Sequence, residues 1–203
     1  MNALFSGGYW TLFHLGGVPV RLHWSVPLVC VLFGGLRFAP GLWLGILLVI
    51  LLHELGHAFF VRRFGLANLG IDLTGIGGLC RWAGEPTPIE RAWVAWGGVL
   101  AQLVLFTVTI VPVAVLGTPS HPWVAQLVEA FLWPNLFVAG FNLIPFAPFD
   151  GAEAWPLFGH LWRRHRARQK WKKKLVKAKD LGETPLEQTL RQALDEADRR
   201  KLH

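Results

Sequence analysis

The feature that most constrains this chain is an apolar run, residues 41–60, that contains two histidines and a glutamate. Around His53, Glu54 and His57 the run is almost wholly apolar. Ionisable side chains cost about 2.5–3.5 kcal/mol each at the centre of a membrane helix, so three within five residues require a function. Residues four apart on a helix face the same way, so both imidazoles can bind one metal ion while Glu54 reaches a water beside it. The spacing predicts a zinc site inside a membrane helix.

The composition also indicates a membrane protein. Of the 203 residues 53% are hydrophobic, and 11 are tryptophan. The first 20 residues lack the basic start and the cleavage site of a signal peptide, so we expect the first hydrophobic segment to be retained. Cys30 and Cys80 match neither a zinc motif nor a disulfide framework, and we expect free thiols in apolar surroundings.

Hydrophobic segments predict four membrane spans: residues 22–38, 41–61 and 93–116, and a fourth that starts near 123 and continues through Pro134 towards Pro145 and Pro148. Between the second and third, residues 66–84 alternate between apolar and small or polar side chains and are rich in glycine, a pattern typical of a β-hairpin. The expected fold class is an all-α polytopic membrane protein with about four transmembrane helices and a small membrane-associated β-hairpin.

The distribution of positive charge predicts the orientation. Arginines 21, 62, 63, 81 and 91 and a basic stretch at 163–179 fall on one side of the predicted spans, which places both termini in the cytoplasm, in a prokaryotic inner membrane. The basic stretch could bind nucleic acid, but its position after the last span favours anionic lipid. We therefore predict a membrane-embedded core, 1–160, and a segment, 161–203, with a short amphipathic cytosolic helix that begins at Thr184.

A catalytic zinc ion needs a third protein ligand. The other histidines near membrane segments lie at the edges of spans or outside them, and Glu129 lies at the far end of the fourth span. Asp150 follows Pro145 and Pro148, which unwind the chain and allow its carboxylate to turn back towards the second span. An ordinary loop aspartate before Gly151 is the alternative interpretation.

Taken together, His53-Glu54-x-x-His57 and the later Asn142-x-x-Pro145-x-x-x-x-Asp150-Gly151 resemble the site-2 protease family of intramembrane zinc metalloproteases, over residues 22–151. The resemblance implies one Zn²⁺ per chain bound by His53, His57 and Asp150, with Glu54 as the general base and Asn142 assisting at the substrate carbonyl. It also implies a membrane-associated hairpin, whose edge at Gly75, Gly77 and Gly78 is expected to bind an extended substrate segment.

The third span departs from the family pattern. A Gly-Pro pair followed shortly by Asn is usual there, whereas this chain has Gly97-Gly98 followed by Gln102. The Gln102 amide either replaces that asparagine or packs between helices. We expect a compact form without the PDZ or CBS modules that some relatives carry.

The predicted function is hydrolysis of a peptide bond within or next to a transmembrane segment of a membrane-protein substrate, a process known as regulated intramembrane proteolysis. One alternative is an inactive membrane scaffold or chaperone with a structural zinc ion, which would have no use for Glu54. Another is an ion transporter, which would carry polar residues on several spans; the third span offers essentially only Gln102.

Overall fold

The computed structural model of this chain describes residues 5–33, 37–75 and 77–180, and the single positions 187, 189 and 192. The chain forms two compact units, residues 1–157 and 158–203. Apart from those single positions, the described part of the second unit is helix α7 (Pro156–Asp180) from Phe158 onward, which carries the predicted basic stretch. The helix predicted from Thr184 lies outside the described residues except for those single positions, and the predicted boundary after residue 160 stays a prediction.

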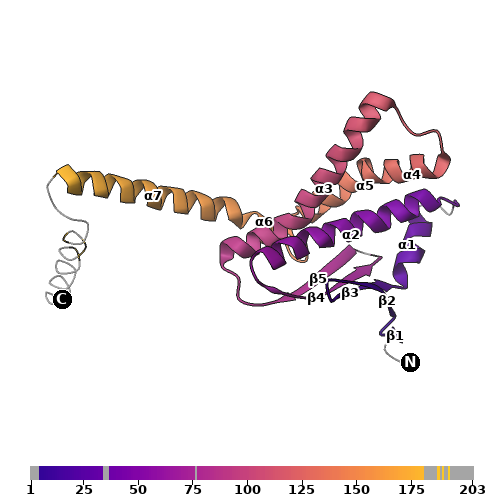
Figure 1. Cartoon of the computed structure of the whole chain (residues 1–203), viewed down its shortest axis with the longest axis horizontal. Coiled ribbons are helices and arrows are strands. Elements are labelled where there is room, and N and C mark those ends of the chain that lie inside the picture. Colours follow the sequence, from indigo (N-terminus) through magenta and orange to yellow (C-terminus); the bar gives the residue numbers. More distant parts are fainter. Residues whose placement is uncertain are drawn as a thin grey trace. The chain divides into compact units, whose positions relative to one another are not determined.

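A five-stranded sheet forms one side of the first unit (Figure 1). Its spatial order follows the sequence: β1 (Phe5–Ser6), β2 (Tyr9–Leu15), β3 (Val18–His23), β4 (Ala67–Thr74) and β5 (Gly77–Ala83). All neighbouring pairs are antiparallel except β3 and β4, which run parallel with Val20 opposite Ile71. Strand β5 is therefore an edge strand.

The sheet corrects two predictions. Strands β4 and β5 form the hairpin expected at residues 66–84, but three N-terminal strands extend it, so the all-α class is incomplete. The predicted span 22–38 is not found in the described residues. The first residues of that predicted span, up to His23, belong to β3. The following helix α1 (Ser25–Phe33) has nine residues, whereas a membrane helix needs about 20.

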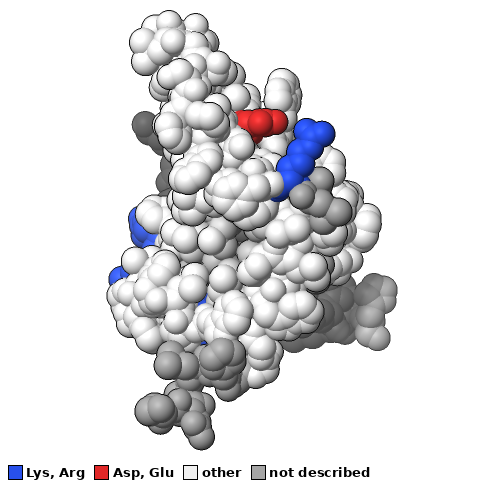
Figure 2. Space-filling view, turned by 90° about the vertical axis from the view of Figure 1, so that its right-hand side faces the viewer, with Lys and Arg blue, Asp and Glu red and all other residues white. Residues whose placement is uncertain are grey.

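Three segments of the described chain are long and apolar enough to cross a membrane. They are α2 (Pro40–Arg63), α3 (Pro88–Leu116), and the consecutive helices α4 (Pro122–Phe131) and α5 (Trp133–Asn142), which are separated by a break at Leu132 before Pro134. From the side on which α1 and α4 lie in Figure 1, the surface carries few charged side chains (Figure 2). Such a surface is expected for a protein in contact with lipid.

Helix α2 is the central element, with the sheet on one side and α3 and α4 packed against it (Figure 1). Its contact with the sheet buries Ala58 against Ile71 and Leu73. Its contact with α3 depends on glycine, because a Cβ at Gly56 or Gly97 would overlap the backbone carbonyl of the other residue. Small residues allow two membrane helices to approach closely. This contact brings α3 close to His53 and His57.

Both cysteines are free and buried, as predicted. Cys80 lies on β5, where burial raises the pKa of its thiol to about 12. The thiol is therefore protonated at neutral pH.

Candidate metal centre

The structure brings the side chains of His53, His57 and Asp150 together. The Nε2 atoms of the two histidines are 3.0 Å apart, and Asp150 Oδ2 lies 2.9 Å from His53 Nε2 and 3.2 Å from His57 Nε2. The first two residues face one another because they lie four apart on α2. Asp150 is 97 residues from His53 in sequence, so only the fold unites the three.

The outer ring nitrogens determine the state of both imidazoles. His53 Nδ1 lies 2.9 Å from Gln102 Oε1, and His57 Nδ1 lies 2.7 Å from the carbonyl oxygen of Val94. Both partners are acceptors, so both Nδ1 atoms donate, and in neutral rings the Nε2 atoms carry lone pairs. Two lone pairs and a carboxylate oxygen then converge on one point.

Such a donor set fits a zinc ion. Zinc binds imidazole nitrogen and carboxylate oxygen at about 2.0–2.2 Å, which separates the ligands of a tetrahedral site by roughly 3.3–3.6 Å. The observed separations of 2.9–3.2 Å are close to this range. The acceptors at Nδ1 also match zinc sites, where the outer nitrogen of a ligand histidine is usually hydrogen-bonded. Three ligands leave the fourth position for water or substrate.

Access to this point is from the Asp150 side. The side chain of Asp150 is 26% exposed, whereas those of His53 and His57 are 6% and 8% exposed. A substrate or water molecule can therefore approach beside the carboxylate, while α2 and α3 cover the imidazoles.

The chain reaches Asp150 by a tight return after α5. Helix α5 ends at Asn142, and the short helix α6 (Gly151–Ala154) begins just after Asp150. Gly151 packs so closely on the Leu143 and Ile144 carbonyls that a Cβ would overlap them, and Trp155 Nε1 donates to the Leu143 carbonyl at 2.7 Å. These contacts turn the segment between α5 and α6 back on itself, as expected from the helix-breaking prolines Pro145 and Pro148.

Glu54 lies between the ligand pair and the edge of the sheet. It is 3% exposed, and the backbone N–H of Cys80 on β5 donates to its carboxylate. A Cβ at Gly78 would overlap the Glu54 side chain. The carboxylate is thus held beside the edge strand by a contact that only glycine permits.

The remaining predicted residues differ in their positions. Asn142 Nδ2 lies 3.5 Å from His53 Nε2, at the rim of the ligand cluster. Of the hairpin glycines, only Gly78 contacts Glu54. Gly75 packs against Ser25 and Val29 of α1, and Gly77 faces open space.

Two buried amides complete the surroundings. Gln102, whose role the sequence left open, is fully buried and accepts the Nδ1 hydrogen of His53. Asn135 on α5 was missed by the sequence analysis. It is also fully buried, and its Nδ2 donates to the backbone carbonyl of Gln102 at 2.9 Å. For both Gln102 and Asn135, the sequence feature that could have predicted a role is an amide side chain within an apolar span, because such a group needs a hydrogen-bond partner there.

No protein-family model matches the chain. Rip3 of Mycobacterium tuberculosis, named a zinc metalloprotease, is 31% identical over 176 residues, covering 74% of this chain and 43% of Rip3. Zinc metalloprotease MJ0392 of Methanocaldococcus jannaschii is 30% identical over 151 residues, covering 69% of this chain and 42% of MJ0392. The chain thus spans less than half the length of these curated relatives.

Among solved structures, a site-2 protease from Methanocaldococcus jannaschii matches with a TM-score of 0.57 and 27% identity, covering 74% of this chain and 71% of that one. The sequence likeness extends to zinc metalloproteases, and the fold likeness to a site-2 protease that shares more than a quarter of the aligned residues. The chain is thus similar to zinc metalloproteases in sequence and to a site-2 protease in fold, and both likenesses support its resemblance to the site-2 protease family.

Proposed function

We propose that this chain is a zinc metalloendopeptidase that hydrolyses a peptide bond within or next to a transmembrane segment of a membrane-protein substrate. The observation that carries the proposal is the buried Glu54 carboxylate beside the converging donor atoms of His53, His57 and Asp150. A site that only holds metal has no use for an adjacent base.

The three converging side chains would hold the ion. When bound, zinc supplies Lewis-acid chemistry, which polarises a carbonyl group and makes a water molecule more acidic. Gln102 and the Val94 carbonyl keep both imidazoles turned with Nε2 inward. The α2–α3 contact at Gly56 and Gly97 excludes bulk water from behind the imidazoles.

Glu54 moves the proton. Its carboxylate accepts a proton from the attacking water, and the water oxygen forms a bond to the carbonyl carbon of the substrate. Glu54 then returns the proton to the amide nitrogen as the C–N bond breaks, which yields a carboxylic acid and an amine. The Cys80 N–H holds the carboxylate in place during both transfers.

Asn142 would assist at the substrate carbonyl. Its Nδ2 lies near the ligand cluster and is uncharged, so it can donate a hydrogen bond to an oxygen that gains negative charge without introducing a second cation.

The edge of β5 is the proposed substrate-binding element. A helical substrate keeps its carbonyl groups in intrahelical hydrogen bonds, so it must unwind before hydrolysis. An unwound segment can add to β5 as a further strand. Supporting this, Glu54 lies against Gly78 and Cys80 of β5, which is an edge strand, so a strand added at this edge would lie close to the base.

Backbone methylation of a substrate peptide tests strand addition. Two peptides are compared, one with N-methyl groups on the odd residues around the scissile bond and one with them on the even residues. In an added strand only one of these two sets has N–H groups that face β5, so methylation of that set should lower cleavage at least about tenfold through the loss of several edge hydrogen bonds. The peptide methylated on the other set is the matched control. Equal cleavage of both peptides would contradict pairing with β5.

The central experiment compares wild type with Glu54→Gln, using metal analysis and cleavage of a synthetic membrane peptide. We expect both proteins to bind one zinc ion and only the wild type to cleave, because glutamine cannot accept the proton. Equal cleavage would remove Glu54 from its role. Zinc bound with no cleavage by either protein would favour the scaffold alternative.

The proposal includes the location of the protein. Both termini lie in the cytoplasm and the spans in the inner membrane of a prokaryotic cell, and the basic helix α7 binds anionic lipid. The described residues before α2 contain no full-length span, but β3 pairs with β4, which follows the arginine end of α2, so the N-terminal strands lie on the same side of the membrane as that end. The arginines at the end of α2 and the many exposed lysines and arginines of α7 support this orientation, because positive residues favour the cytoplasmic side.

A further inference from the structure

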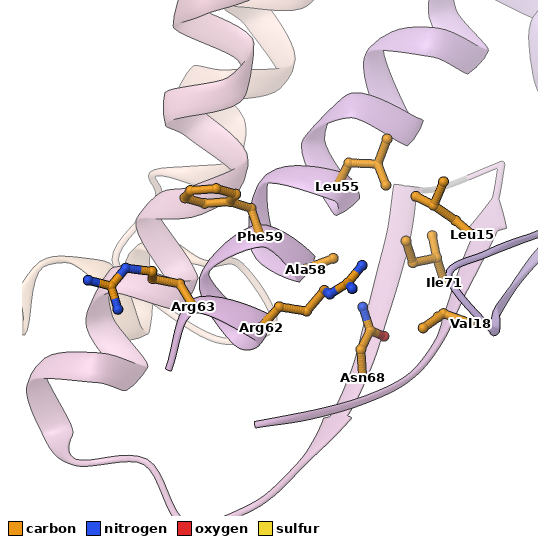
Figure 3. Close-up of a pocket in the computed structure, with 9 residues that line it drawn as sticks. All are labelled: Leu15, Val18, Leu55, Ala58, Phe59, Arg62, Arg63, Asn68 and Ile71. Atoms are coloured by element: carbon orange, nitrogen blue, oxygen red, sulfur yellow. The ribbon is translucent and has the colours of Figure 1, made fainter. Parts of the chain in front are cut away.

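A cavity of about 470 Å³ lies on the opposite side of α2 from the imidazoles, where α2 meets the sheet (Figure 3). Its walls are largely apolar and come from α2 (Leu55, Ala58), from the β2–β3 hairpin (Leu15, Val18) and from β4 (Ile71). Its size is within the range of small-molecule sites, about 300–1,000 Å³.

Two polar side chains reach into this cavity from opposite sides. Figure 3 shows the guanidinium of Arg62 pointing into it from α2, and the amide of Asn68 pointing towards Arg62 from β4. The backbone N–H of Gly70 donates to Asn68 Oδ1 at 3.2 Å, which leaves the Asn68 NH₂ group turned towards the cavity. Neither Arg62 nor the Asn68 NH₂ group bonds to an acceptor in the described part of the chain.

Donors that face one another without an acceptor indicate an anionic partner. The carboxylates nearest in the sheet are not available, because Asp72 is already paired with Arg21 and Arg81. A guanidinium and an amide NH₂ together match the oxygen atoms of a phosphate group.

The position of the cavity identifies the source of that phosphate. Arg62 lies in the last turn of α2, which is one of the candidate spans, so the cavity opens where a span ends and lipid headgroups begin. Apolar side chains at its rim are exposed beside the cation: Phe59 is 62% exposed and Leu15 46% exposed. A phosphate next to a hydrocarbon chain satisfies both features.

We propose that this cavity binds the headgroup phosphate and the adjoining acyl chain of an anionic phospholipid. Arg62 and Asn68 hold the phosphate, and the apolar wall of Leu15, Val18 and Ile71 covers the start of the chain. The site is separate from the metal centre and from the basic helix α7, and it does not rest on the proposed protease activity.

A simpler role for Arg62 is to complement the negative end of the helix dipole or to orient the span. Arg63, the next residue, serves those roles equally well. It also borders the cavity, but in Figure 3 its side chain points away from Arg62 and Asn68. Arg63 is thus a matched control, with the same charge and almost the same position.

The test is native mass spectrometry of the full chain in a nonionic detergent, after removal of bound lipid, with phosphatidylglycerol or phosphatidylcholine added. Arg62→Gln should weaken binding of phosphatidylglycerol about tenfold or more, the effect of losing a charged hydrogen bond. Asn68→Asp should do the same, because it keeps the acceptor for Gly70 and places a carboxylate opposite Arg62. Arg63→Gln should change binding less than about twofold.

Three results would overturn the proposal. Equal losses in Arg62→Gln and Arg63→Gln would indicate attraction to charge without a site. Equal retention of phosphatidylcholine would exclude recognition of an anionic headgroup. Binding of a soluble acidic peptide that depends on Arg62, without retention of lipid, would assign the cavity to a protein segment. Arg62 and Asn68 are not core residues, so unchanged thermal unfolding of the variants serves as the folding control.

Discussion

Gln102 illustrates how one amide orients a metal ligand at the residue scale. It lies on α3, where Gly98 allows the helix so close to His53 that a Cβ would overlap the imidazole. Its Oε1 accepts from His53 Nδ1, and its own backbone carbonyl accepts from Asn135. It is a positioning residue and does not itself contact the point where the three ligands converge.

Replacing Gln102 by leucine should therefore weaken zinc binding about 10–100-fold, the usual effect of losing such an outer hydrogen bond. Gln102→Glu, which keeps an oxygen acceptor, should retain more affinity. Competition with a chelator measures both, and Leu103→Ala, at an exposed site on the same helix, is the control. Unchanged affinity in Gln102→Leu would show that His53 is oriented by other contacts.

Gly78 makes a second prediction at this scale. In Gly78→Ala the new methyl group would overlap the Glu54 side chain and displace the proposed base. Peptide cleavage should fall about 100-fold, the range for loss of general-base catalysis, while zinc content stays at one per chain. Gly140→Ala, where a Cβ meets no atom within 4 Å, is the matched control. Full activity of Gly78→Ala would separate β5 from the reaction.

At the scale of elements, the crossing of α2 and α3 holds the centre together. Gly56 and Gly97 meet backbone to backbone, so a side chain at either position must separate the two helices. The same crossing places the Val94 carbonyl at His57 and Gln102 at His53.

Gly97→Ala should consequently destabilise the protein by about 1–3 kcal/mol, because the obstacle is backbone that cannot rotate away. Thermal unfolding in detergent should show a lower midpoint, together with weaker zinc binding. Gly140→Ala again serves as control, since α5 has open space there. Lower zinc affinity without lower stability would mean that the crossing orients ligands but does not limit stability.

At the scale of the whole molecule, the metal centre links two parts of the first unit that are far apart in sequence. Two ligands come from α2 and the third from the return after α5. An ion bound only by the folded chain stabilises it, by about 2.7 kcal/mol at a free concentration of 100 times its Kd.

Removal of zinc by a chelator should therefore lower the unfolding midpoint of the wild type. Asp150→Ala should have a low midpoint and show little further effect of chelation, because it lacks the third ligand. Glu54→Gln should respond like the wild type, since it keeps all three. An equal response of Asp150→Ala and the wild type would contradict the role of Asp150 as a ligand.

Much of the metal centre could be predicted from the sequence because its signals are local. The spacing of His53 and His57 fixes their common face on any helix, and a long apolar run predicts a span without knowledge of its neighbours. The prolines before Asp150 predicted that the last span ends there, as it does at Asn142. The catalytic and binding roles assigned to these residues stay predictions until the variants are measured.

The sheet could not be predicted because its pairing is not local. Strand β3 pairs with β4 across α1 and α2, and the apolar residues of 22–38 are therefore divided between a strand and a short helix. Hydrophobic periodicity says which face of a segment is buried, but not which distant strand covers it.

The sequence by itself determined that this is a membrane-embedded chain with a histidine pair on a spanning helix, since helix periodicity and apolar length act within a single segment. Only the tertiary structure decided that Asp150 meets that pair, that Gln102 orients His53, and that the edge of β5 holds Glu54. Those contacts depend on how closely separate elements approach, and glycines at their crossing points allow that approach only once the elements have packed together.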